Sequence, residues 1–241
     1  LEWQASRHSH GPMPTHSRRS SPLAAYFAAA IGVLIVYACL HPFTGWRDPG
    51  LPPFDFLWLP WPRYYTWIDL TVNVIGIVPF SFALVAALPG RLSRGWAVLA
   101  TILITFLLSL SVETLQNFLP SRVPSNVDVG CNTLGGVLGA LAGGRWGGRL
   151  FDPRSGLTRW RKRRIVDGQL GEVGLVVLGL WLLTLLTPES LLFASGDLRH
   201  LFDLPTPLQF NPTRFVKVEA AIAASQLVAV GLTARSMMRQ F

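Results

Sequence analysis

The chain has 241 residues, of which 50% are hydrophobic and only 14% are charged, and its formal net charge is +8. Soluble domains usually carry about 25% charged residues, so this composition excludes an ordinary soluble domain and indicates an integral membrane protein. The basic residues fall between apolar runs, with no zinc-binding spacing and no RNA-binding aromatic signature, which argues against a nucleic-acid partner. Two cysteines, Cys39 and Cys131, exclude a disulfide-rich framework and leave a single pair as an alternative.

Six apolar segments follow a polar N-terminal tail, residues 1–22, which we expect to be disordered. Most approach the roughly 20 residues that a helix needs to cross a hydrocarbon core. The predicted helices are Leu23–Leu40, Leu70–Leu88, Trp96–Val112 with an extension to about Leu119, the glycine-rich Val129–Gly144, Leu170–Thr187 and Phe215–Ala234. We therefore predict an all-α, polytopic transmembrane helical bundle of about six helices. Residues 23–150 form a four-helix core, 151–169 a basic cytoplasmic loop, and 170–241 a two-helix membrane hairpin.

The distribution of lysine and arginine predicts the orientation. Most of the 21 basic residues share one side if the N-terminus is cytoplasmic, which gives six crossings with both termini in the cytoplasm. The densest basic run, Arg159–Arg164, is expected to contact anionic lipids, with a protein partner as the alternative. The aromatic loop His41–Trp67 then lies outside, where its rings serve as interfacial anchors or, alternatively, as a lid over a substrate.

Polar and ionisable residues gather at the predicted outer ends of three helices. Because the second and fourth helices start there and the third ends there, their polar side chains reach the same depth. Residues three and four apart share a helix face, so these groups should point into the bundle. The predicted polar cluster consists of Asp69, Asn73, Glu113, Gln116, Arg122, Asp128 and Asn132.

Two further patterns bear on this cluster. The segments "DLTVNVIG" and "DVGCNTLG" both follow D-x-x-x-N-x-x-G, which suggests either a decayed duplication or two similar ways of capping a helix. The fourth helix also carries a glycine at every fourth position, a ladder that lets a neighbouring helix approach closely. These helix-packing residues are Gly135, Gly139, Gly143 and Gly147.

The cluster has a structural and a functional interpretation. In the structural one, Asp69 and Asp128 cap helices and Glu113 pairs with Arg122. In the functional one, the cost of placing ionised groups in a membrane indicates a site, because such residues usually mark function. That site could bind a cationic or polar headgroup, hold a divalent cation through oxygen ligands, or perform acid–base chemistry with Glu113 or Asp128 as the catalytic group. The sequence has no metal-binding motif and implies no other cofactor.

The segment "SVETLQNFLPSRVPSNVDVGCNTLGGVLGAL" resembles the signature of VanZ-like membrane proteins, in which Glu-x-x-Gln precedes a loop Arg and then Asp-x-x-x-Asn-x-x-Gly. "DLTVNVIGIVPFSFAL" resembles an earlier segment of the same family, with Asn73 and Pro79 at the matching positions. The resemblance covers about residues 24–150. It implies functional roles for Glu113, Gln116, Arg122, Asp128 and Asn132.

The VanZ-like family is named for an accessory protein of teicoplanin resistance, and the resemblance implies a multi-pass protein of the bacterial inner membrane. The leading hypothesis is action at the outer leaflet on a cell-envelope component, such as a lipid-linked precursor, or on a glycopeptide. Two alternatives remain: a membrane enzyme that processes a lipid-linked envelope substrate, and a non-enzymatic membrane scaffold that uses the basic segment Arg145–Arg164.

Overall fold

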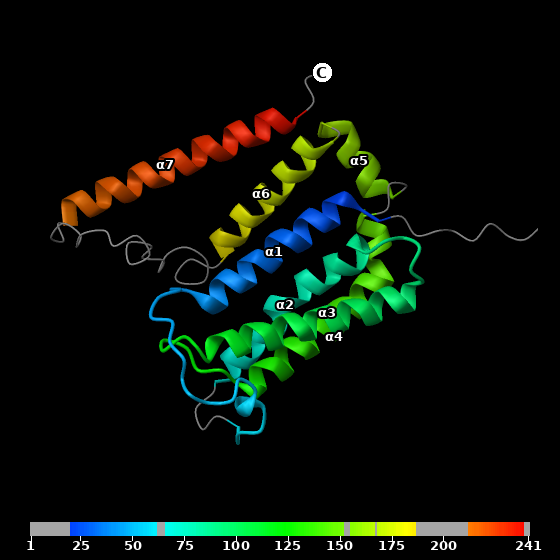
Figure 1. Ribbon diagram of the computed structural model, residues 1–241. Helices are drawn as coiled ribbons and strands as arrows, with labels where there is room; N and C mark the ends of the chain where they lie inside the picture. Colours follow the sequence, from blue (N-terminus) through cyan, green and yellow to red (C-terminus); the bar gives the residue numbers. More distant parts are fainter. Residues whose placement is uncertain (1–19, 62–65, 152–154, 167, 187–211, 239–241) are drawn as a thin grey trace, which may run out of the picture.

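The computed structural model describes residues 20–61, 66–151, 155–166, 168–186 and 212–238, and these ranges are helical apart from loops and one isolated bridge (Figure 1). The predicted all-α class is confirmed. Six of the helices correspond to the six predicted apolar segments, and a short basic helix is added. The elements are α1 (Pro22–Leu40), the 3₁₀ helix η1 (Asp55–Leu57), α2 (Trp67–Ala87), α3 (Arg94–Gln116), α4 (Asn126–Phe151), α5 (Gly156–Arg164), α6 (Gln169–Leu186) and α7 (Pro212–Met237).

Four of these helices, α1, α2, α3 and α7, are long and apolar enough to cross a membrane. Large hydrophobic side chains, such as Val33, Ile75 and Leu103, are exposed on their surfaces, and contact of these side chains with water would be unfavourable. Helix α4 is less apolar because glycines and polar residues replace its hydrophobic side chains, and it packs between α2 and α3. The chain is therefore a multi-pass helical membrane protein.

Close approach between α2 and α4 forms the tightest contact in the bundle. A Cβ atom at Gly135, Gly139 or Gly143 would overlap the backbone of α2, at the carbonyl groups of Val74, Val78 and Phe82 respectively. Gly147 differs, because a Cβ there would meet only the Cβ of Ala86, at an ordinary 3.7 Å. Glycine therefore brings the two helices into backbone contact over three of the four ladder positions.

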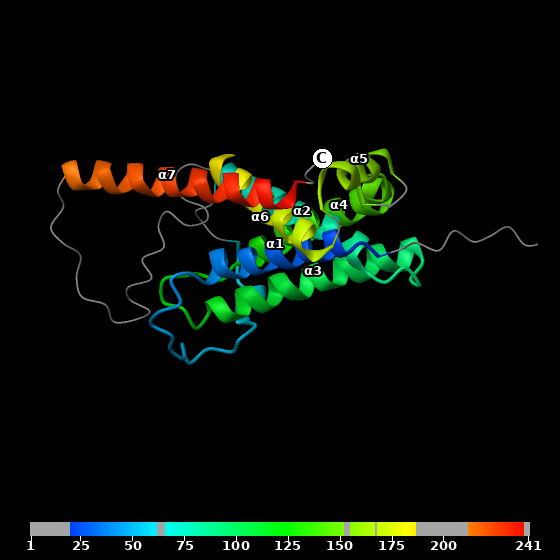
Figure 2. The same cartoon turned by 90° about the horizontal axis from the view of Figure 1, so that it is seen from above.

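The two ends of the bundle differ in composition. At one end the Ser21 amide donates to the carbonyl of Ala86 (3.1 Å), and the Val166 amide donates to the carbonyl of Met237 (2.8 Å). These bonds join the start of α1 to the end of α2, and the α5–α6 link to the end of α7. We call this the basic end, because α5 lies there. The opposite, polar end holds the described part of the α1–α2 loop, residues 41–61, and the α3–α4 turn. In Figures 1 and 2, α7 runs beside α6 and away from α3.

Within the segment predicted as a basic cytoplasmic loop, residues 151–169, the structure has the short helix α5 over residues 156–164. Ser155 caps this helix by accepting a hydrogen bond from the Thr158 amide (3.1 Å), and arginine and lysine are good helix formers. Its last turn is entirely basic, which the negative end of a helix dipole favours.

Helix boundaries also differ from prediction. Helix α4 extends beyond Gly144 to Phe151, because packing against α2 and α3 outweighs the poor helix propensity of glycine. Helix α3 stops at Gln116 and passes into tight turns, in which the Leu119 amide donates to the Gln116 carbonyl (2.9 Å). Of the predicted tail, residues 1–19 lie outside the described ranges, whereas Ser21 caps α1 and Pro22 begins it.

Candidate functional site

Glu113 is the most deeply buried ionisable residue of the predicted cluster, with 3% of its surface exposed. It lies in the last turn of α3, and its Oε2 accepts a hydrogen bond from the Ser125 amide (2.9 Å). The Ser125 hydroxyl in turn accepts from the Val127 amide at 3.2 Å and from the Asp128 amide at 3.4 Å. Glu113 therefore binds the residue that caps α4 and fixes the turn between the two helices.

Asp69 makes its hydrogen bonds at the start of its own helix, with Thr66, and not with the other members of the predicted cluster. Its carboxylate completes a capping box with Thr66 at the exposed start of α2: Oδ2 accepts from the Thr66 amide (3.0 Å), and the Asp69 amide donates to the Thr66 hydroxyl (3.1 Å). The Thr66 hydroxyl also donates to Oδ2 (2.7 Å), so Asp69 is held by the amide and the side chain of Thr66, as the structural interpretation expects.

Asp128 occupies the equivalent position after Ser125 but makes a different bond. Because Glu113 takes the Ser125 amide, the Asp128 carboxylate is available to another helix. Its Oδ1 accepts a 2.7 Å hydrogen bond from Nδ2 of Asn73 on α2. Asn132, one turn further along α4, donates from Nδ2 to the Ser109 hydroxyl of α3 (3.0 Å). The polar residues of α4 thus tie it to both neighbours.

Gln116 and Arg122 bind the C-terminal end of α1, whose last carbonyl groups have no partner within the helix. Gln116 Nε2 donates to the Cys39 carbonyl (3.1 Å). Arg122 donates from Nη2 to the Ala38 carbonyl (2.9 Å), and from Nε and Nη2 to the His41 carbonyl (3.0 and 2.8 Å). A guanidinium at this position also meets the negative end of the helix dipole.

The alternative in which Glu113 pairs with Arg122 is therefore wrong: within the described residues, no ion pair joins them. The α1 carbonyls satisfy the guanidinium, and a backbone amide satisfies one oxygen of the carboxylate. The alternative of a disulfide is wrong as well, since Cys39 and Cys131 are both free thiols.

Two asparagines attach the aromatic loop to the polar end of the bundle through hydrogen bonds. Asn117 Nδ2 donates to the Pro53 carbonyl (2.7 Å), and Asn126 Nδ2 donates to the Leu59 carbonyl (2.7 Å). Near these anchors, Trp58 and Trp61 are 86% and 71% exposed. Indole rings at this exposure suit a membrane interface or contact with a bound molecule.

A row of buried polar residues continues from Glu113 along α3 and was missed from sequence. Thr101, Thr105 and Ser109 precede Glu113 at intervals of four, and each has at most 4% of its surface exposed. The Thr105 hydroxyl lies 3.0 Å from that of Ser81 on α2 and donates to the Thr101 carbonyl (2.8 Å). The four-residue spacing is the signal that identifies this row.

Most side chains of the polar cluster use their hydrogen-bonding groups within the fold. Two acids each retain one carboxylate oxygen that could accept a further hydrogen bond. Among the described residues, Oε1 of Glu113 and Oδ2 of Asp128 accept no hydrogen bond. The two acids are linked through Ser125, whose amide donates to Glu113 and whose hydroxyl accepts from the Asp128 amide. The described ranges contain no group of three or more His, Cys, Asp or Glu side chains that could hold a metal ion. The arrangement can therefore accept donors from a ligand at a pair of carboxylates.

A family model described as VanZ/LLP1 matches residues 17–144, more than half of the chain. The chain belongs to the VanZ/LLP1 family. The match ends within α4, so α5, α6 and α7 lie beyond it. No curated protein and no solved structure matches the chain significantly. Every residue of the polar cluster falls inside the VanZ/LLP1 match.

Proposed function

We propose that this VanZ/LLP1 protein acts at the outer leaflet of the bacterial inner membrane on a cell-envelope component or a glycopeptide, with tolerance to teicoplanin as one consequence. The observation that carries the proposal is the pair of carboxylates, Glu113 and Asp128, each with one oxygen that accepts no hydrogen bond from the described residues. Glu113 is 3% exposed, and an ionisable residue placed within a membrane helix is costly and usually marks function, which supports a functional reason for its presence.

The surroundings of the two acids support a ligand with both polar and apolar parts. Carboxylate oxygens accept from ammonium, hydroxyl or amide groups, and the exposed Trp58 and Trp61 offer apolar surface in the loop that is fastened over the same end. A lipid-linked envelope precursor and a glycopeptide both combine such parts. The basic residues of α5 lie at the opposite end, and the positive-inside rule supports an outer position for the two acids.

The proposal is tested by deleting the gene and restoring it on a plasmid. Deletion should change the glycopeptide concentration that inhibits growth, or the composition of lipid-linked envelope precursors extracted from the membrane, and the plasmid should reverse the change. If neither quantity differs between the deletion strain and its parent, the proposal is wrong.

A second candidate, favoured by the burial of Glu113, is an enzyme that processes a lipid-linked substrate with Glu113 or Asp128 as the acid–base group. Purified protein should then convert an envelope lipid, and added Mg²⁺ tests whether a divalent cation assists at the two carboxylates. Binding of the lipid without turnover, with and without Mg²⁺, would rule out the enzyme and leave the first proposal intact.

A further inference from the structure

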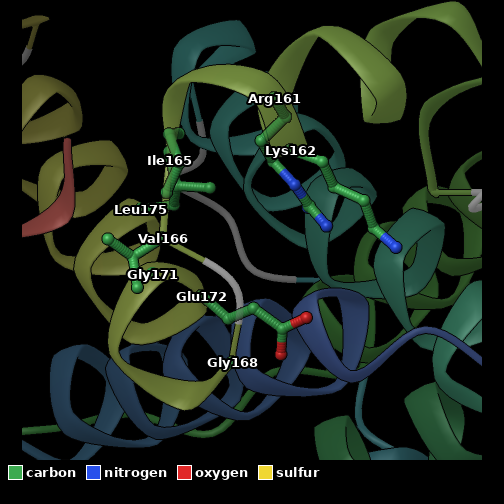
Figure 3. Close-up of a pocket in the computed structure, with 8 residues that line it drawn as sticks. All are labelled: Arg161, Lys162, Ile165, Val166, Gly168, Gly171, Glu172 and Leu175. Carbon is green, nitrogen blue, oxygen red and sulfur yellow. The ribbon is translucent and has the colours of Figure 1, made fainter. Parts of the chain in front are cut away.

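A second site candidate lies at the basic end, away from the two carboxylates of the polar end. A cavity of about 160 Å³ opens between α5 and the start of α6. Figure 3 shows Arg161 and Lys162 reaching into it from α5, and Glu172 reaching from the first turn of α6. Nothing in the polar cluster depends on this cavity.

The charged side chains that line the cavity do not form ion pairs with one another. Within the described ranges, no ion pair joins Glu172 to Arg161 or Lys162. The cavity thus presents two cationic hydrogen-bond donors and one carboxylate to a ligand. Arginine and lysine bind phosphate oxygens through charge-assisted hydrogen bonds, and a carboxylate attracts an ammonium group.

The remaining walls are apolar. Ile165, Val166 and Leu175 line the cavity beside the charged groups. On the same helix as the cations, Leu157 and Trp160 are 51% and 60% exposed, a combination of basic and apolar side chains that is typical of helices lying in a membrane interface. A ligand that belongs to the membrane, with a charged head and an apolar body, fits these walls better than a soluble phosphate.

We propose that this cavity binds the headgroup of phosphatidylethanolamine from the leaflet at the basic end. Arg161 and Lys162 hold the phosphate, Glu172 holds the primary ammonium, and the apolar wall meets the glycerol region. Phosphatidylglycerol has no cationic group for Glu172, and phosphatidylcholine has no N–H to donate to it. The carboxylate therefore makes the site selective between phospholipids that share a phosphate.

The test uses the full chain purified in detergent and titrated separately with phosphatidylethanolamine, phosphatidylglycerol and phosphatidylcholine, with bound lipid measured by native mass spectrometry. The wild type should retain phosphatidylethanolamine about tenfold more strongly than phosphatidylcholine, the ratio expected from one additional strong hydrogen bond. Arg161→Gln combined with Lys162→Gln should weaken retention of both ethanolamine and glycerol lipids by about tenfold.

Two further variants separate the site from general surface charge. Glu172→Gln should weaken phosphatidylethanolamine and spare phosphatidylglycerol, so that the ratio between the two lipids falls. Arg163→Gln with Arg164→Gln removes the same charge from the same helix at residues that do not line the cavity, and it should leave that ratio unchanged.

The proposal is overturned if the Arg163/Arg164 variant loses as much phosphatidylethanolamine as the Arg161/Lys162 variant, because diffuse charge then explains the binding. It is also overturned if Glu172→Gln leaves the ratio of the two lipids unchanged. Size-exclusion elution and the thermal unfolding midpoint check that each variant is folded. If the Arg161/Lys162 variant fails this check, the Glu172→Gln ratio decides.

Discussion

Asn73 and Asp128 are joined by a 2.7 Å hydrogen bond between Nδ2 and Oδ1, across 55 residues of sequence and between the two helices in closest contact. The bond exists because Glu113 occupies the Ser125 amide that Asp128 would otherwise accept, as Asp69 does from Thr66. Because Glu113 binds the Ser125 amide, the Asp128 carboxylate can bind Asn73 on α2. The polar end is thus a single network in which the role of each carboxylate depends on its neighbour.

Exchanging the two side chains tests this bond. Asn73→Asp places two carboxylates at the contact, so it should lower the free energy of unfolding by at least the ~0.6 kcal/mol that an interhelical hydrogen bond averages in membrane proteins. Asn73→Asp combined with Asp128→Asn restores one acid and one amide and should recover most of the loss. Thermal unfolding in detergent measures both. A double variant as unstable as the single one would show that the pair does not act as a unit.

The glycine ladder gives a matched pair of substitutions. Gly139→Ala forces a methyl group against the Val78 carbonyl and Cβ of Ser81, and it should cost about 1–3 kcal/mol. Gly147→Ala meets only Ala86 at 3.7 Å, so it should change the unfolding free energy by no more than about 0.5 kcal/mol. Equal losses, measured by thermal unfolding, would contradict the backbone contact between α2 and α4.

Arg122 should stabilise the last turn of α1. Arg122→Gln removes hydrogen bonds to the Ala38 and His41 carbonyls, each of which is worth about 1.5–3 kcal/mol when the donor is charged. Amide hydrogen exchange at residues 37–43 should therefore become faster. Arg91→Gln, an exposed arginine at the basic end, is the control and should leave exchange there unchanged. Unchanged exchange in the Arg122 variant would contradict the capping role.

Two threonines one turn apart on α3 should respond in opposite ways to valine. Thr105→Val removes bonds to Ser81 and to the Thr101 carbonyl and should cost about 0.6–1.7 kcal/mol. The Thr101 hydroxyl is buried without a hydrogen-bond partner in the described structure, so Thr101→Val should be neutral or stabilising. A larger loss from the Thr101 variant than from the Thr105 variant would contradict the assignment.

Helix identity follows largely from sequence, because long apolar runs dictate membrane helices and proline or polar residues mark their ends. The α4 segment shows the limit: its glycine ladder predicts a close neighbour, but it does not say that this neighbour is α2. Helix α5 shows another, since a run of basic residues suits both a loop and a capped helix.

The sequence predicts which polar side chains share one end of the bundle and that Asp69 caps a helix, but it does not predict most of the hydrogen-bond partners. Topology predicts which side chains share a depth, whereas hydrogen-bond partners depend on helix rotation and on loop path. The patterns Thr66-x-x-Asp69 and Ser125-x-x-Asp128 do indicate helix starts. They do not reveal that Glu113 displaces Asp128 from its cap, because that depends on the α3–α4 turn.

The central claim is that the charge of Glu113 serves function and its hydrogen bond serves the fold. Glu113→Gln separates the two, because the amide oxygen can still accept from the Ser125 amide. Gly147→Ala is the matched control for a conservative change in the same bundle.

The most direct measurement is therefore complementation of a deletion strain by Glu113→Gln, with membrane protein level and unfolding midpoint recorded alongside the glycopeptide concentration that inhibits growth. We predict a folded protein at wild-type level that fails to restore the parental concentration, while Gly147→Ala restores it. Full restoration by Glu113→Gln would contradict the claim and leave this carboxylate with a structural role alone.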